Sequence, residues 1–571
     1  MQVLKQLLFA LSMATLMGGT AHAAADQKAG AATAALLKST ADHSKFKELQ
    51  RPFQSGPEVT KACLTCHTEA AKQIHQTQHW KWEYVNPGTG QTLGKRHVIN
   101  NFCTSVSSNY KACASCHIGY GMEDGSKFDF ASQENVDCLV CHDATGKYKK
   151  PSGFAGNPVT KDTEFPPGSG KIIRGIDLQA IAQKVGKTRR ETCGACHFYG
   201  GGGDAVKHGD LDSSLEQPDK ALDVHMDAEG NNFTCATCHK TDGHQVPGSR
   251  YAPTAMDKGG AHMRGKADSS NPATCQACHG QAPHGMAKLN DHTDKVACQT
   301  CHIPAFARGD MPTKMSWDWS TSGKRDAKGK PLVITNDDGH ITYNGIKGDF
   351  VLEENVRPEY MWFNGSVKYT LLGDDIDKSR QPIAINTFEG GPDDGKSMIW
   401  PVKVFRGKQP FDPVNRSLVV AHLAGEDDTA YWKNMDWQKA ITAGMAMVGK
   451  PYSGKVDFIE TVAMWPITHM VAPKEKAVRC DECHSSNGRL EKVDGIYIPG
   501  RGRDHFGLLE AGGWALVALT LLGVVGHWLA VAARIKQTPI FILIIAGARW
   551  RRRGRLAGWR GGGRDRGARA H

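Results

Sequence analysis

The stretch Cys63-Leu64-Thr65-Cys66-His67 sets the pattern that decides the fold of this chain. The same Cys-x-x-Cys-His spacing recurs seven more times along the 571 residues. Two cysteines three positions apart, followed directly by a histidine, form the attachment signature of c-type haem. The two thiols add to the haem vinyl groups, and the histidine becomes the proximal ligand of the iron. Zinc sites or disulfides would explain the cysteine pairs, but they give no role to a histidine after every copy.

The eight motifs predict eight covalently bound haem c groups. The expected attachment residues are Cys63, Cys66, Cys113, Cys116, Cys138, Cys141, Cys193, Cys196, Cys235, Cys238, Cys275, Cys278, Cys298, Cys301, Cys480 and Cys483. The expected proximal ligands are His67, His117, His142, His197, His239, His279, His302 and His484. Acidic loops near the haem propionates are also candidate calcium sites.

An apolar segment lies near each end of the chain, and the two segments predict different functions. Residues 1–23 have a basic start at Lys5, an apolar run and a small-x-small ending at Ala23, which predicts a secretory signal peptide. Residues 511–533 are long and apolar enough for a transmembrane helix. Arg-rich residues 534–571 follow, which predicts a cytoplasmic tail and a periplasmic body anchored in the inner membrane.

The positive net charge resides in that tail. From Arg534 onward there are eleven Lys or Arg residues and one acid, Asp565, which gives +10 of the +11 carried by the whole chain. A basic tail beside a membrane span faces anionic lipid. The charge therefore gives no reason to expect nucleic acid as a partner.

The spacing of the motifs predicts the domain organisation. Residues 24–310 hold seven motifs, 311–460 hold none, 461–505 hold the eighth, and the anchor and tail follow. The first region has little apolar periodicity, so we expect a mostly α-helical and irregular chain wrapped around haems. Alternating polar and apolar residues predict short strands and loops in the haem-free insert, at 329–347, 360–372 and 398–404. We expect helices at 177–187 and 428–448.

Electron-carrying haems usually take a second, distal histidine. Twenty-five histidines are enough for all eight haems, so counting does not reveal an open iron. His244 and His284 each lie five residues after a proximal histidine, so each is expected to serve a neighbouring haem. The candidate distal ligands are His43, His75, His79, His225, His244, His262, His284, His292 and His469.

Two features remain outside the motifs. Cys103 is the seventeenth cysteine, and it is either a small buried apolar residue or a thiol in a reactive pocket. Four glycines, 200–203, precede Asp204 and Lys207. One helical turn would place that acid and amine on one face, where they would form a solvated ion pair or supply protons to a substrate at an iron. His527, within the apolar span, is a weak candidate ligand.

Several segments together resemble the octahaem tetrathionate reductases. They are Asn101-Phe102-Cys103, 201–207, 297–304 and 465–470, combined with the long gap before the last motif. The resemblance covers about residues 43–490. It implies seven bis-histidine haems and one active-site haem, on the second motif, with a lysine as distal ligand and an Asp and a Cys beside it. By this resemblance Lys207, Asp204 and Cys103 are the catalytic candidates, with Lys149 or Lys150 as alternative ligands.

The resemblance implies reduction of small inorganic anions, tetrathionate to thiosulfate and nitrite to ammonium, and also of hydroxylamine to ammonium. The expected electron donor is a quinol-oxidising membrane protein or a periplasmic cytochrome. The membrane anchor departs from the best-known form of the family, which puts the donor in doubt. Two alternatives stay open, a membrane-anchored electron conduit without catalysis, and an octahaem nitrite reductase or hydroxylamine oxidoreductase.

Overall fold

A computed structural model describes residues 40–259, 273–499 and 506–537. The predicted signal peptide and nearly all of the Arg-rich tail lie outside the described residues, as does His262. The chain divides into two units. The first holds the body up to Cys483 together with Gly488–Ile496, and the second holds His484–Asn487 and the chain from Tyr497.

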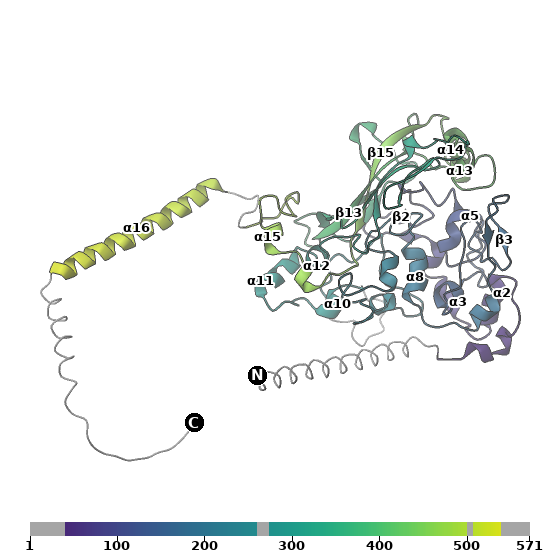
Figure 1. The fold of residues 1–571 in the computed structure, drawn as a ribbon, viewed down its shortest axis with the longest axis horizontal. Helices are drawn as coiled ribbons and strands as arrows, with labels where there is room; N and C mark the ends of the chain where they lie inside the picture. The colour runs from purple at the N-terminus through teal and green to yellow at the C-terminus, as the bar shows by residue number, and fades with distance from the viewer. Residues whose placement is uncertain (1–39, 260–272, 500–505, 538–571) are drawn as a thin grey trace, which may run out of the picture. The chain divides into compact units, whose positions relative to one another are not determined.

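Short helices joined by irregular chain make up the part of the body that carries the first seven motifs (Figure 1). Each motif lies on or beside a short helix. A helix places residues three apart on one face, which favours the same direction for both thiols of a motif. The helix expected at 177–187 is shorter, because Asp177 caps it and it ends at Ala182. The α-helices are α2 (Gly56–Leu64), α3 (Ala70–Ile74), α4 (Gln78–Lys81), α5 (Tyr110–Cys113), α6 (Leu139–His142), α7 (Leu178–Ala182), α8 (Arg190–His197), α9 (Cys235–Cys238), α10 (Gln276–His279), α11 (Ala287–Asn290), α12 (Cys298–His302) and, later in the chain, α15 (Cys480–Cys483).

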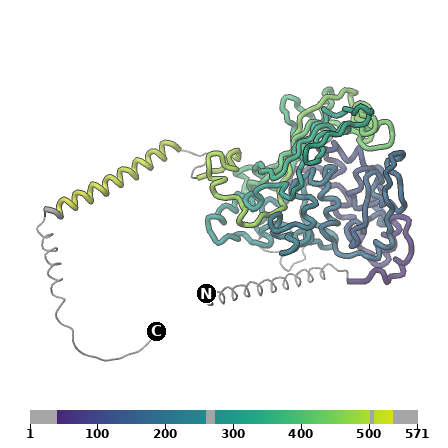
Figure 2. Tube along the Cα trace, viewed as in Figure 1, coloured from purple at the N-terminus to yellow at the C-terminus, as the bar shows by residue number. Residues whose placement is uncertain are grey.

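A sheet of nine strands forms within residues 313–466, in the order β11-β15-β13-β5-β8-β7-β6, with β9 and β14 also paired to β13. In Figure 2 this sheet is the teal and green part of the body, and the purple and blue tube is the chain of the first motifs. The strands are β5 (Thr313–Asp318), β6 (Val333–Thr335), β7 (Ile341–Asn344), β8 (Gly348–Glu353), β9 (Glu359–Phe363), β11 (Ile383–Ala384), β13 (Met398–Asp412), β14 (Ser417–Leu418) and β15 (Asp457–Pro466). Two-stranded pairs are β1 (Tyr84–Val85) with β2 (Thr92–Leu93), β3 (Thr163–Glu164) with β4 (Ile172–Ile173), and β10 (Val367–Tyr369) with β12 (Asn386–Phe388).

The expectation of only short strands was wrong for β13, which spans 15 residues. Most of β13 is buried on both faces, so its sequence does not alternate and its length is hidden. Helices α13 (Tyr431–Asn434) and α14 (Trp437–Met447) pack against the sheet, near the helix expected at 428–448. Ile99 and Phe102 join the same buried cluster, which fixes the segment that carries Cys103.

Helix α16 (Gly507–Gln537) belongs to the second unit. Residues 507–534 have a mean hydropathy of 2.1 in their most apolar window and are exposed in the structure. The helix is long and apolar enough to anchor in a membrane.

Candidate functional site

Six motif histidines face a second imidazole at a nearly constant separation. An imidazole nitrogen binds a metal at about 2 Å, so two rings across one metal have centroids roughly 6 Å apart. The ring centroids lie 5.9 to 6.4 Å apart in the pairs His43–His67, His79–His197, His142–His244, His225–His279, His239–His469 and His284–His302. Each pair thus has the spacing of two ligands on opposite sides of one iron.

In two of these rings Nδ1 donates a hydrogen bond, which leaves Nε2 available. Nδ1 of His142 donates to the carbonyl oxygen of Gly186 at 2.8 Å, and Nδ1 of His239 donates to that of Pro247 at 2.9 Å. Burial lowers the pKa of His197 to about 3, so this imidazole is neutral at pH 7. Neutral imidazole is the form that binds metals.

His117, in the second motif, is held differently. Its Nε2 lies 2.7 Å from the carbonyl oxygen of Trp80, and its ring is enclosed by Trp80, Trp82, Phe128 and Phe130. Within residues 40–259 and 273–499, no second imidazole faces His117 at the spacing of the six pairs. The second motif therefore stands apart from the other six motifs of the first region.

Two further candidate distal ligands, His75 and His292, lie within hydrogen-bond distance of backbone carbonyl groups. His75 stacks on Trp80 with 4.7 Å between centroids, and its Nε2 lies 3.2 Å from the carbonyl oxygen of Ser132. Nδ1 of His292 donates to the carbonyl oxygen of Lys288 at 2.7 Å. The described contacts do not bring the His75 ring to the spacing of the six pairs.

Thiols of different motifs lie close together, which orders the motifs in space. The Cys196 thiol lowers the pKa of Cys116, so the second and fourth motifs are neighbours. In the same way, a thiol of one motif shifts the pKa of a thiol of another motif: Cys138 acts on Cys63, Cys141 on Cys193, Cys193 on Cys235, Cys278 on Cys238, Cys298 on Cys275 and Cys483 on Cys301. The contacts connect motifs 1, 3, 4, 5, 6, 7 and 8 in series, with motif 2 branching from motif 4.

Cys103 lies beside the second motif. Its thiol contributes to raising the pKa of Cys113, mainly a result of burial, and burial also raises the pKa of Cys103 itself. The neighbouring Phe102 ring packs where a Cβ on Gly201 would lie, at 3.1 Å. Only glycine leaves room for this approach, so the glycine run brings the Asp204–Lys207 segment against the Cys103 segment.

Asp204 and Lys207 do not share a helical face, because residues 201–206 form turns and Ala205 has a positive φ of 58°. Asp204 Oδ1 accepts a hydrogen bond from the backbone N of Ser213 at 3.0 Å. The Lys207 ammonium lies 4.6 Å from the ring centroid of Trp465. Arg250 lies 4.9 Å from the same centroid, so two cations flank one indole.

Buried polar contacts anchor this segment to the sheet. Lys403 Nζ, on β13, donates to the carbonyl oxygen of Val206 at 3.0 Å, and Thr313 Oγ1, on β5, donates to that of Ala205 at 2.6 Å. The backbone N of His469 donates to Asp210 Oδ2 at 3.1 Å, and the Nδ1 of His469 lies 3.3 Å from the same oxygen. One segment thus carries Lys207 and also holds a histidine of the fifth motif's pair.

A crystal structure of an octahaem cytochrome c from Shewanella oneidensis matches this chain with a TM-score of 0.68 and 41% sequence identity. The match covers 80% of this chain and 95% of that chain. The chain belongs to the octahaem cytochrome c family. Family models described as "Cytochrome c bacterial" and "Cytochrome c554 and c-prime" match residues 314–487 and 62–143. An uncharacterized protein of Archaeoglobus fulgidus is 24% identical over 246 residues, which are 36% of this chain and 80% of that protein.

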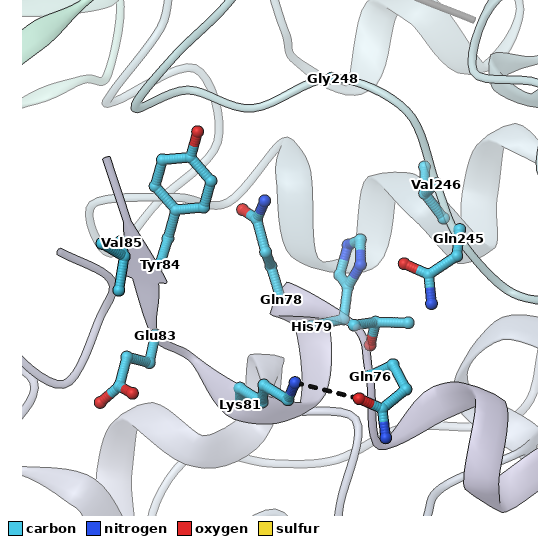
Figure 3. Close-up of a pocket in the computed structure, with 11 residues that line it drawn as sticks. Gln76, Gln78, His79, Lys81, Glu83, Tyr84, Val85, Gln245, Val246 and Gly248 are labelled. Atoms are coloured by element: carbon cyan, nitrogen blue, oxygen red, sulfur yellow. Dashed lines mark hydrogen bonds between the residues drawn. The ribbon is translucent and has the colours of Figure 1, made fainter. Parts of the chain in front are cut away.

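The described residues of this octahaem cytochrome fit covalently bound haem. A cavity of about 410 Å³ is bordered by His79, which faces His197, and by Gly248 (Figure 3). A Cβ on Gly248 would lie 3.4 Å from the His239 ring, so a side chain there would fill the space beside that imidazole. A second cavity of about 470 Å³ is lined by His75, Trp80, Arg96 and Phe130, close to the second motif.

Sequence reasoning missed the residues that hold the ligands and the Lys207 segment. Lys403 and Thr313 are strand residues with no motif around them, and only the folded sheet brings them to Val206 and Ala205. Asp210 offered a signal, because it is an acid three residues after Lys207. Trp465 likewise begins a segment that carried the family resemblance.

Proposed function

We propose that the chain is a periplasmic, membrane-anchored reductase that carries one haem c on each of its eight motifs. Six haems would be held by the six imidazole pairs, and the second motif would hold the active site. Haem supplies one-electron transfer and, where a coordination position is displaceable, an iron at which a substrate is reduced. The observation that carries this proposal is that His117 faces no second imidazole among the described residues.

The surroundings of Lys207 favour an anionic substrate. Lys207 and Arg250 both lie against Trp465, and within the described residues neither forms an ion pair with a carboxylate. Cations grouped without acid partners attract anions. Tetrathionate, nitrite and the less charged hydroxylamine are the proposed substrates, with thiosulfate or ammonium as products.

We assign a role to each catalytic candidate. Lys207 would act as the displaceable distal ligand and as a proton donor, and Asp204 would deliver protons to the same site. Cys103 is protonated at neutral pH because burial raises its pKa. It is therefore better suited to hold a sulfur chain by contact than to attack it as a thiolate.

The order of neighbouring thiols suggests the route of electrons. They would enter from a quinol-oxidising membrane protein or a periplasmic cytochrome, pass along the series of motifs and branch at motif 4 to motif 2. Helix α16 would hold the enzyme at the membrane near its donor. A calcium ion stays a proposal, since among the described residues no three acid, His or Cys side chains are grouped to hold a metal.

The test is oxidation of reduced methyl viologen by the detergent-solubilised full chain, with tetrathionate, nitrite or hydroxylamine added. We expect turnover with at least one substrate. Lys207→Ala should lower kcat roughly 100-fold or more, the usual loss for a proton donor, whereas exposed Lys220→Ala should retain it. No turnover with any substrate, in protein that carries eight haems, would indicate an electron conduit instead.

A further inference from the structure

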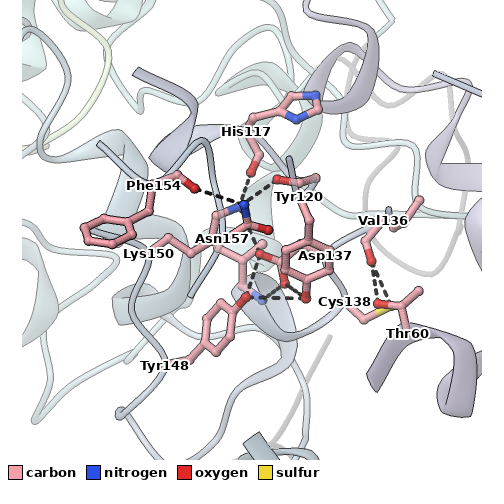
Figure 4. Close-up of polar contacts among 12 residues, drawn as sticks. Thr60, His117, Tyr120, Val136, Asp137, Cys138, Tyr148, Lys150, Phe154 and Asn157 are labelled. Atoms are coloured by element: carbon pink, nitrogen blue, oxygen red, sulfur yellow. Dashed lines mark hydrogen bonds and ion pairs between the residues drawn. The ribbon is translucent and has the colours of Figure 1, made fainter. Parts of the chain in front are cut away.

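A buried ion pair lies between the second and third motifs. Lys150 Nζ and Asp137 Oδ2 are 3.0 Å apart, and the two side chains are 2% and 0% exposed (Figure 4). Lys150 also donates to the carbonyl oxygens of His117 and of Gly119, the latter at 3.2 Å. Asp137 directly precedes Cys138. The lysine end of the ion pair therefore lies at the second motif, and the aspartate end lies at the third motif.

The carboxylate has donors of its own. Tyr120 OH donates to Asp137 Oδ1 at 2.8 Å, and Tyr148 OH donates to Oδ2 at 2.9 Å. The backbone N of Val140, within the third motif, donates to Oδ1 at 3.1 Å. A buried charge persists only when it is paired and hydrogen-bonded. These contacts supply the hydrogen bonds, and Lys150 supplies the opposite charge.

The pair is therefore a dipole with a defined direction. Its positive end touches the His117 carbonyl of the second motif, and its negative end touches the backbone of the third motif. Burial limits screening by salt, so the field of such a pair reaches its neighbours. A nearby cation stabilises an added electron, and a nearby anion destabilises it.

We propose that Lys150 and Asp137 form a fixed dipole that raises the reduction potential of the second motif's haem relative to that of the third motif's haem. The dipole would direct electrons toward the second motif. One electron would be given up by the third motif's haem and, by way of the fourth motif, accepted by the second motif's haem, while Lys150 and Asp137 keep their protons. This inference needs haem on both motifs but does not depend on the substrate or on Lys207.

The experiment is spectroelectrochemical titration of the full chain and of two variants. Lys150→Met leaves the carboxylate and should lower at least one of the haem potentials. Asp137→Asn leaves the ammonium and should raise at least one. The double variant should shift less than either single variant. If the ion pair only stabilised the fold, both single variants would loosen the site and shift the haem potentials in the same direction. That result would overturn the proposal.

Lys150→Met can fail to accumulate, because it leaves a buried charge unpaired. In that case Asp137→Asn alone tests the proposal. A higher reduction potential for one haem supports the dipole, and unchanged or lower haem potentials overturn it. Lys150→Arg retains the charge and is the matched control, expected to keep the parent potentials. Haem content by pyridine haemochrome is measured for every variant, so that only fully loaded protein is compared.

Discussion

Replacing Asp210 by Asn should raise the reduction potential of the haem at the fifth motif. Asp210 Oδ2 lies 3.3 Å from Nδ1 of His469, whose ring faces His239. Adding the width of the imidazole and a metal bond of about 2 Å would place the carboxylate about 7 Å from an iron bound by His469. At an effective dielectric constant of about 20, one unit charge at that distance is worth about 2 kcal/mol.

For a one-electron couple this energy corresponds to about 100 mV, since a tenfold change in the equilibrium is about 59 mV. The side chain of Asp210 is buried, and the amide keeps an oxygen for the backbone N of Thr468, so the fold should persist. The assay is a spectroelectrochemical titration in which one haem moves upward and the others stay. Asp212→Asn removes a buried acid from the same segment that is bonded to Ser214 and not to a histidine. An unchanged titration for Asp210→Asn, or an equal shift for Asp212→Asn, would refute the reasoning.

Three further variants test neighbouring parts of the account. His244→Ala removes the ring that faces His142, so one low-spin haem should become high-spin in the electron paramagnetic resonance spectrum, and an unchanged spectrum would exclude this pair. Because burial raises the pKa of Cys103, this thiol should resist iodoacetamide at pH 8 in the native protein and react after denaturation. Mass spectrometry measures the labelling, and rapid labelling of the native protein would contradict the burial of this thiol. Lys403→Met leaves the Val206 carbonyl without its donor, which should lower the free energy of unfolding by about 1–3 kcal/mol in chemical denaturation. An unchanged denaturation midpoint would show that this contact contributes nothing to stability.

The cofactor class could be predicted from the sequence because haem attachment requires only the local Cys-x-x-Cys-His spacing. The membrane-length helix was equally local, since its apolar run is continuous. The long strand β13 was not predictable from alternation, because burial on both faces removes the signal. The contacts of Lys403 with Val206 and of Lys150 with His117 join residues 197 and 33 positions apart, so they exist only in the folded chain.

The histidine assignments show the same limit. Proximal histidines follow from the motif, whereas a distal partner comes from anywhere in the chain. His469 faces His239 across 230 positions, and no local pattern encodes that. The expectation that His244 serves a neighbouring motif agrees with where its ring lies, because a chain of five residues is too short to reach the far side of its own haem.

The central claim is that the second motif differs from the others and that Lys207 acts there. The most direct measurement is the electron paramagnetic resonance and near-infrared magnetic circular dichroism of the fully oxidised full chain, compared with Lys207→Ala. We expect one haem of the eight to show a ligand set other than bis-histidine, and that haem alone to change its spectrum in the variant. Identical spectra for the two proteins, or bis-histidine signals from all eight haems, would contradict the account.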